Sequence, residues 1–198
     1  MNILTGTAHA EITVKKSVFR AEVFYTKDAQ DAREIIKRQK ERYRDARHVV
    51  HAFVIGENGE IHGCSDDGEP PGTAGQPVLA LLKGSGITNI LVTVTRWFGG
   101  VLLGTGGLVK AYSDAVKAAL AEVTAEPLVK KNRFVCECRY EDHTRVRHAA
   151  EGLPAEFSDT EFSQSVMLRG SIPVEYAEAF ASLITEVTRG CSSVRFLD

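Results

Sequence analysis

Hydrophobic and polar positions along this chain of 198 residues follow first a strand pattern and then a helix pattern. The stretch Ile12–Tyr25 is rich in β-branched and aromatic residues, which predicts a strand. Asp28 stands at the expected N-cap of a helix whose apolar residues recur at helical spacing as far as Tyr43. Within His51–Cys64, the dipeptide Asn58-Gly59 predicts a hairpin turn between two strands.

The same pattern continues through the middle of the chain. Pro77–Gly86 predicts a short buried helix that ends at Gly84, and Asn89–Phe98 predicts a buried strand. Leu108–Val123 then carries apolar residues along one helical face. The first half is therefore expected to alternate strands and helices and to finish on a long helix.

Near Glu126-Pro127 the pattern restarts and runs in the order strand, helix, strand, strand, helix, strand. That βαββαβ order is the ferredoxin-like arrangement. We therefore expect an α+β protein of two domains, residues 1–125 and residues 126–198. No tandem repeat and no low-complexity linker separates the two halves.

Two cysteines on the first strand of the second half suggest either a core stripe or a zinc site with the nearby histidines. Cys136 and Cys138 share a strand face with Phe134 and Tyr140, because side chains two positions apart point the same way. The spacing does not match common zinc patterns, and free cysteine packs as a small apolar residue. The core stripe is the favoured interpretation, and no metal or cofactor is expected.

Composition and charge exclude several classes of protein. The apolar fraction is 43%, the charged fraction is 25% and the formal net charge is −2, so bulk charge requires neither a nucleic acid nor a membrane as partner. No apolar run reaches the length of a transmembrane helix, and the first ten residues do not resemble a signal peptide. Four cysteines without paired spacing favour a reducing compartment, and we expect a cytoplasmic protein.

The most unusual segment is Cys64–Pro77, which combines three carboxylates with three glycines and three prolines. Neither a helix nor a strand accommodates that mixture, so the segment is predicted to be a loop of fixed shape. Asp66, Asp67 and Glu69 have three possible uses: they bind a hard cation such as Mg²⁺, pair with Arg96, or fix the loop through backbone N–H groups. The sequence leaves these alternatives open.

Two glycine-rich runs each precede a predicted helix. The first contains Gly72, Thr73 and Gly75, with Thr73 as the expected N-cap. The second run holds Gly99, Gly100, Gly104, Gly106 and Gly107. Backbone N–H groups at helix starts attract anions, so the two runs are expected to cradle a phosphate or a nucleic-acid backbone, with Arg96 completing the pocket. The standard P-loop and dinucleotide motifs are absent.

Other polar residues are weaker candidates. His48 precedes the hairpin and is expected to approach the carboxylate loop, where a His–Asp pair would serve acid–base chemistry; no nucleophile is obviously placed beside it. The basic run Lys37–Arg47 is either a solvated helix face or an RNA contact. Lys130, Lys131 and Arg133 form a smaller basic cluster that is a second candidate for nucleic-acid contact.

The segments SDDGEPPGTAGQPVL and VTRWFGGVLLGTGGLVKAYSDAV together resemble the signature of the IMPACT family, in its bacterial YigZ-type members. The resemblance covers roughly residues 15–120 and includes His48. It implies a first domain like a ribosomal-protein module shared with domain IV of elongation factor G, and a second domain like the ferredoxin-like end domain of that factor. Relatives often carry Cys where this chain has Val50, so thiol chemistry at that position is not expected here.

The resemblance and the residues together favour a translation-associated binding protein that contacts RNA, the ribosome or a translation factor. Two alternatives are a phosphate-handling enzyme that uses the carboxylate and glycine loops, and a protein-interaction module in the ferredoxin-like half. No catalytic residue is assigned and no membrane partner is expected. The predicted ligand-binding residues are Asp66, Asp67, Glu69, Gly72, Thr73, Gly75, Arg96, Gly99, Gly100, Gly104, Gly106, Gly107 and His48.

Overall fold

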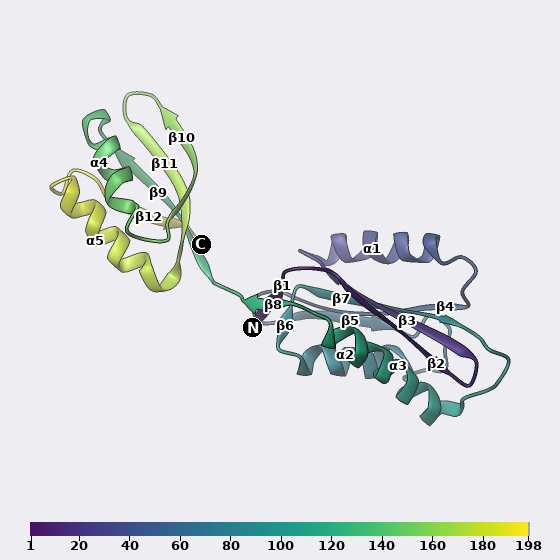
Figure 1. The fold of residues 1–198 in the computed structure, drawn as a ribbon. Coiled ribbons are helices and arrows are strands. Elements are labelled where there is room, and N and C mark those ends of the chain that lie inside the picture. Colours follow the sequence, from purple (N-terminus) through teal and green to yellow (C-terminus); the bar gives the residue numbers. More distant parts are fainter. Residues whose placement is uncertain (198) are drawn as a thin grey trace. The chain divides into compact units, whose positions relative to one another are not determined.

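The computed structural model describes residues 1–197, and the chain divides into two compact units between Leu128 and Val129. The first unit (Figure 1) contains, in order, β1 (Asn2–Leu4), β2 (Ala8–Val14), β3 (Ser17–Tyr25), α1 (Ala29–Arg42), β4 (His48–Ile55), β5 (Ile61–Ser65), α2 (Gly75–Gly84), β6 (Ile87–Thr88), β7 (Ile90–Trp97), α3 (Gly104–Ala121) and β8 (Ala125–Pro127). No helix in the described part of the chain has the length and apolar character needed to cross a membrane.

The first unit is built on an antiparallel sheet with the strand order β2-β3-β7-β4-β5. Helices α2 and α3 cover one face, while α1 lies on the other (Figure 1). The central strand β7 is buried from Ile90 to Arg96, as predicted, although Thr93, Thr95 and Arg96 are polar or charged. Strand alternation sends Val92 and Val94 towards α2 and α3, and Leu91 towards α1.

The predicted single strand Ile12–Tyr25 is wrong, because the chain turns back on itself at Lys15-Lys16. Both lysines have positive φ, 44° and 68°, and β2 and β3 pair as a hairpin from Ala8↔Val23 to Val14↔Ser17. Two left-handed residues form the tight turn that antiparallel strands prefer. Glycine or asparagine normally marks such a turn, and neither is present, so the sequence carried no signal for it.

A small second sheet closes the end of the first unit. β1 pairs in parallel with β6 and antiparallel with β8, where Asn2 faces Pro127 and Leu4 faces Ala125. The residues just after the predicted boundary at 125 are therefore hydrogen-bonded to the start of the chain. The division of the chain lies three residues further on, after Leu128.

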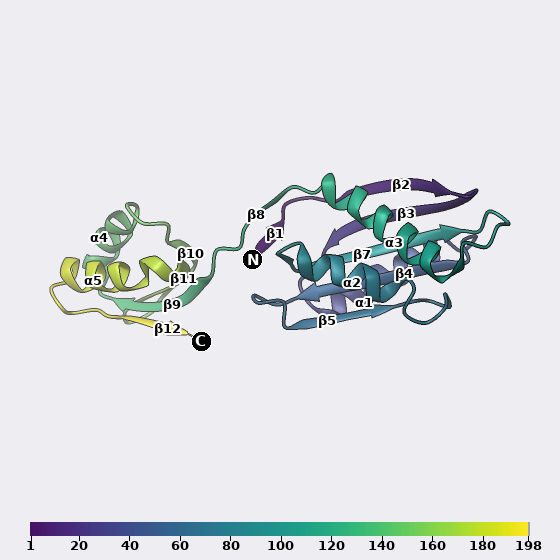
Figure 2. The ribbon, with the colours of Figure 1, turned by 90° about the horizontal axis from the view of Figure 1, so that it is seen from below.

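The second unit contains β9 (Lys131–Cys138), α4 (Tyr140–Ala150), β10 (Glu156–Phe162), β11 (Val166–Pro173), the 3₁₀ turn η1 (Val174–Tyr176), α5 (Ala177–Val187) and β12 (Val194–Leu197). Its antiparallel sheet has the order β10-β11-β9-β12, with α4 and α5 packed on one face (Figure 2). This is the ferredoxin-like arrangement predicted from the element order.

The cysteines of β9 lie in the core of this unit, as predicted. Cys136 and Cys138 are buried beside Phe134, Leu168 and Phe180. Tyr140 does not continue the stripe, because it begins α4 and is exposed. Burial raises the pKa of the Cys136 thiol to about 12, so little reactive thiolate forms at neutral pH.

We therefore expect the four cysteines to differ in their reactivity with an alkylating reagent at pH 8. Cys191 is exposed and should be modified first, Cys64 is half-buried and should follow, and Cys136 and Cys138 should stay unmodified until the protein unfolds. Peptide mass spectrometry of samples quenched over time gives the order, and a sample in guanidinium gives the fully reactive reference. Early labelling of Cys136 in the native protein would contradict the buried stripe.

Candidate functional site

The centre of the predicted site is a buried ion pair that joins three elements. Arg96 of β7 donates from Nη1 to Oε1 of Glu69 at 2.5 Å, and the hydroxyl of Tyr112 in α3 donates to the same oxygen at 2.8 Å. The side chains of Arg96 and Glu69 are only 7% and 3% exposed. Pairing with Arg96, one of the uses that the sequence left open for the loop carboxylates, is therefore present, and the carboxylate is Glu69.

Two phenylalanine rings lie close to the guanidinium of this pair. The Arg96 guanidinium lies 5.3 Å from the ring centre of Phe19 and 5.6 Å from that of Phe98. Burial, together with the negative charge of Glu69, raises the pKa of Tyr112, so its hydroxyl stays protonated and donates. A buried charge is stable only when it is paired and hydrogen-bonded, and here Glu69 receives both the guanidinium and the phenol.

Asp66 fixes the start of α2. Its Oδ1 accepts from the N–H groups of Ala74 at 3.0 Å and Gly75 at 2.7 Å, and its Oδ2 accepts from Gly72 at 2.8 Å. Burial alone would raise the pKa of Asp66, but the three N–H donors hold it below its usual value. The helix-start amides of α2 are thus already occupied by a carboxylate from eight or nine residues upstream.

The prediction that Thr73 caps α2 is wrong. The N-cap residue is Ala74, which supplies no side-chain cap, and the Thr73 hydroxyl instead donates to the carbonyl of Pro70 at 2.7 Å. Asp66 satisfies the helix start in place of the expected threonine. A helix end needs an acceptor for its free N–H groups, but that acceptor need not be adjacent in sequence.

Asp67 ties the loop to the strand and the helix beside it. Its Oδ2 accepts from the N–H of Val49 at 2.7 Å, and its Oδ1 pairs with Lys40 of α1. The carbonyl of Asp67 meets Nδ1 of His48 at 2.8 Å, which leaves His48 Nε2 3.8 Å from Oε1 of Glu69. His48 therefore reaches the carboxylate loop, as expected, but it contacts the backbone of Asp67 and not its carboxylate.

The three carboxylates thus serve three separate sets of donors and do not converge on one point. Asp66 binds backbone amides, Asp67 binds Val49 and Lys40, and Glu69 binds Arg96 and Tyr112. Across residues 1–197, no three His, Cys, Asp or Glu side chains are grouped so as to hold a metal ion. The geometry supports two of the three uses that the sequence left open: loop fixing and pairing with Arg96.

A groove of about 360 Å³ lies beside this framework, between the loop after β5, the end of β7 and the start of α3. We call it the α3 groove. Its lining residues are Arg47, His48, Gly68, Glu69, Pro70, Arg96, Phe98, Leu102, Leu103, Gly104, Thr105 and Leu108. Arg47 and Leu102 were not among the predicted ligand-binding residues, although Arg47 ends the basic run Lys37–Arg47 and Leu102 lies in the second signature segment.

The start of α3 opens into this groove without a cap. Leu103 is the N-cap residue and provides no side-chain acceptor for the first-turn N–H groups. A Cβ at Gly104 or Gly106 would meet no atom within 4 Å, so the space before the helix is open. Gly104 also has a φ of +73°, which a residue with a side chain rarely adopts. The amides here are therefore available to an anion.

Other glycines of the predicted site are required by the backbone structure of the first unit. A Cβ on Gly99 would lie 2.0 Å from the backbone of Lys16, and one on Gly75 would lie 2.8 Å from the backbone of Ser65. Gly72 and Gly75 donate their amides to Asp66, and Gly100 holds a φ of +84°. The two glycine runs do not jointly cradle an anion, because only the start of α3 is open.

The basic cluster of the second half lies in the other unit, at and just before the start of β9. Lys131 Nζ pairs with Oε1 of Glu156 on β10 at 2.7 Å, which lowers the pKa of Glu156. Lys130 precedes the strand and Arg133 lies on it. These residues are part of a charged strand face, and their contact with nucleic acid stays a prediction.

The fold and the α3 groove define a class of α+β protein with two compact units. In its first unit, the carboxylates of the acidic loop after β5 are bonded to donors within the protein, and the uncapped start of α3 lies beside that loop. Comparison with known proteins agrees with this class. Residues 15–120 match the Impact N-terminal domain family, and residues 136–190 match a domain of unknown function, DUF1949. The chain belongs to the IMPACT family.

Individual relatives cover nearly the whole chain. IMPACT family member YigZ of Escherichia coli (strain K12) is 34% identical, covering 89% of this chain and 88% of the relative. An IMPACT family member of Haemophilus influenzae is 36% identical, covering 95% of this chain and 92% of the relative. A crystal structure of a hypothetical protein superposes with a TM-score of 0.78 at 31% identity, covering 100% of this chain and 97% of that one.

Replacing Glu69 by Gln should destabilise the protein strongly, because it leaves the Arg96 guanidinium buried without a counter-charge. We expect the free energy of unfolding to fall by about 3–5 kcal/mol. Denaturant unfolding followed by circular dichroism measures the change. The matched control is Glu34→Gln on the exposed side of α1, which should cost less than about 0.5 kcal/mol. Equal effects of the two substitutions would contradict the structural role of the pair.

The Asp66 carboxylate should contribute to stability only while it is ionised. Its folded-state pKa is lowered, so the contribution is complete above the unfolded-state value of about 3.9 and is lost as pH falls through the folded-state pKa. Asp66→Asn should therefore be less stable than the parent at pH 7, by about 1 kcal/mol, and the difference should shrink between pH 4 and pH 2. Melting temperatures across that range test this, and a constant difference would count against it.

Proposed function

We propose that this chain is a translation-associated binding protein that contacts RNA through the α3 groove. One observation carries the proposal: the loop carboxylates are neutralised by internal bonds, so the groups left facing the groove are cationic or amide donors. Arg47 is exposed and has no ion-pair partner among residues 1–197, and the amides of the first turn of α3 have no side-chain cap from Leu103. This arrangement accepts an anion and supplies no evident nucleophile.

The apolar wall of the groove suits a base attached to that anion. Phe98 is 41% exposed and Leu102 is 84% exposed, so both present apolar surface to the solvent at the groove. An RNA phosphate at the start of α3, beside Arg47, would bring the adjoining base within reach of the Phe98 ring. Stacking of bases on aromatic side chains is the usual source of affinity for single-stranded RNA.

The translation context rests on the family resemblance, which implies two domains like those of translation factors. The net charge of −2 stands against extensive contact with nucleic acid and limits RNA binding to a small patch. Such binding is weak and falls as salt rises, because each phosphate contact releases counterions. The phosphate-handling enzyme is less well supported, because the carboxylates needed to hold Mg²⁺ are committed to Arg96, Lys40 and backbone amides.

Co-sedimentation with ribosomes and with free single-stranded RNA, across a salt series, tests the proposal. The parent should bind at low salt and lose affinity as salt rises. Arg47→Glu should weaken binding about tenfold or more, because it places a carboxylate beside the phosphate position, and Phe98→Ala should also weaken it by removing the stacking surface. Arg33→Glu, the same charge change on an exposed position of α1, should bind much more like the parent than Arg47→Glu does.

A double variant, Lys130→Glu with Lys131→Glu, belongs in the same series because it tests the second predicted contact. If it reduces binding and Arg47→Glu does not, RNA contact lies in the second unit and the α3 groove assignment is wrong. Absence of sedimentation even at low salt would refute RNA and ribosome binding altogether.

A further inference from the structure

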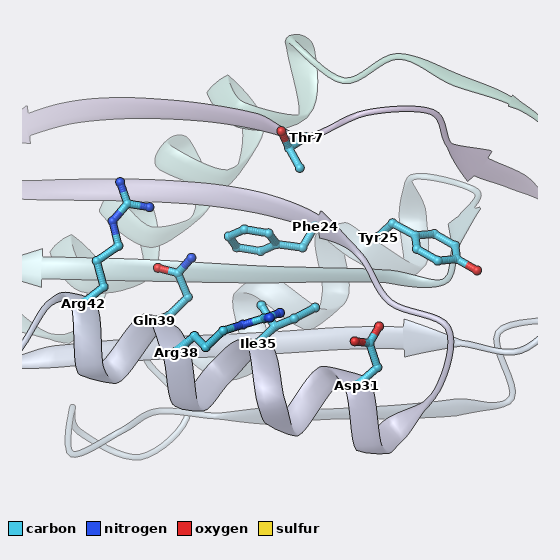
Figure 3. Close-up of a pocket in the computed structure, with 8 residues that line it drawn as sticks. All are labelled: Thr7, Phe24, Tyr25, Asp31, Ile35, Arg38, Gln39 and Arg42. Atoms are coloured by element: carbon cyan, nitrogen blue, oxygen red, sulfur yellow. The ribbon is translucent and has the colours of Figure 1, made fainter.

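The opposite face of the sheet carries a second hollow, which no part of the proposed function uses. It has a volume of about 450 Å³, within the usual range for small-ligand sites. Helix α1 packs over β4 and β7, and the hollow lies between α1 and the neighbouring strand β3. Figure 3 shows the side chains of this α1–β3 groove: Thr7, Phe24, Tyr25, Asp31, Ile35, Arg38, Gln39 and Arg42.

The middle of the α1–β3 groove is apolar and partly aromatic. The Phe24 ring lies between β3 and α1, facing the side of the helix that carries Ile35 (Figure 3). Tyr25 follows on the strand and is 44% exposed. A flat, apolar ligand group would replace water over these side chains, and an aromatic ligand would gain stacking energy as well.

A buried amide in the wall lacks a hydrogen-bond partner. Gln39 is 5% exposed and lines the groove, and its Oε1 is buried with no donor within hydrogen-bonding distance. An unsatisfied buried acceptor is costly, so such a group usually has a water or ligand donor. The amide also carries an N–H₂ group, and because Oε1 is buried, a ligand would reach the donor and the acceptor together only after the side chain rotates.

Two arginines give this groove its positive charge. Arg42 forms an ion pair with Glu22, and the distance from Nη1 of Arg42 to Oε1 of Glu22 is 3.4 Å. Arg38 is exposed and has no ion-pair partner within residues 1–197, and its guanidinium extends along the groove over Ile35 (Figure 3). Asp31, at the far end, already accepts from the N–H of Lys27. A phosphate group would form a charge-assisted hydrogen bond with the guanidinium of Arg38.

We propose that the α1–β3 groove binds a nucleotide, with the base over Phe24 and the phosphate on Arg38. Glutamine forms a paired donor–acceptor contact with N6 and N7 of adenine, so Gln39 would give the site a preference for that base once its amide turns towards the groove. The nucleotide is either a free mononucleotide or one residue of an RNA strand, because both present the same base and phosphate. Phe24 and Arg96 lie on opposite faces of the sheet, so the α1–β3 groove and the α3 groove are separate sites. Ligand binding at one can therefore be tested independently of binding at the other.

Isothermal titration calorimetry of the full chain tests the site with AMP, GMP, CMP, UMP, adenosine, inorganic phosphate and a short oligoadenylate. We expect AMP to bind more tightly than adenosine or inorganic phosphate alone. Arg38→Ala should weaken AMP binding about tenfold or more, whereas Arg33→Ala, at an exposed position five residues earlier on α1, should leave it unchanged. Gln39→Met, which keeps the volume, should reduce the preference for AMP over the other nucleotides.

The comparison of AMP with oligoadenylate identifies the source of the nucleotide, since oligoadenylate binding that depends on Arg38 without AMP binding means a strand residue. The proposal is overturned if neither ligand binds, if Arg38→Ala binds like the parent, or if inorganic phosphate binds as tightly as AMP. Melting temperatures of all variants confirm folding. Arg47→Glu should not alter AMP binding, so a failure of RNA binding at the α3 groove remains distinguishable.

Discussion

The buried contact of Glu69 with Arg96 and Tyr112 is the constraint on which the first unit's site depends. It connects a loop, the central strand and the long helix through one carboxylate oxygen. Because Glu69 and Arg96 are nearly free of solvent, neither charge can be left without the other. The loop after β5 is therefore held in one position, and the two neighbouring aspartates are placed to bind α2 and β4.

The acidic character of this loop is consequently architectural. Asp66 satisfies the helix start that would otherwise attract an anion, and Asp67 neutralises Lys40 while binding the strand. Because the carboxylates are bonded within the protein, the groups that remain available to a ligand beside them are Arg47 and the amides at the start of α3. A segment rich in negative charge thus produces a groove suited to a negative ligand, which the charge of the segment alone would not suggest.

Most features that depend on residues close together in the sequence were predicted, whereas some that depend on distant residues were missed. The buried strand β7, the β4–β5 hairpin and the N-cap at Asp28, which accepts from Asp31 N–H, depend on residues close in sequence and were predicted. The hairpin connection runs from Gly56 to Glu60 and is longer than the two-residue turn predicted at Asn58-Gly59. The turn at Lys15-Lys16 was missed because lysine gives no local sign of positive φ. The cap of α2 was assigned to Thr73 because local rules look to the preceding residue, whereas the acceptor came from Asp66.

The amino-acid sequence was sufficient for the family, the α+β class and the ferredoxin-like order of the second half. Periodicity and motifs depend on residues that are close together in the sequence, so they can be recognised before the structure is known. Which carboxylate meets Arg96, which helix start stays open and where a hollow forms beside α1 depended on tertiary structure. Each of these is decided by contacts between residues that are far apart in the chain, and burial sets their strength.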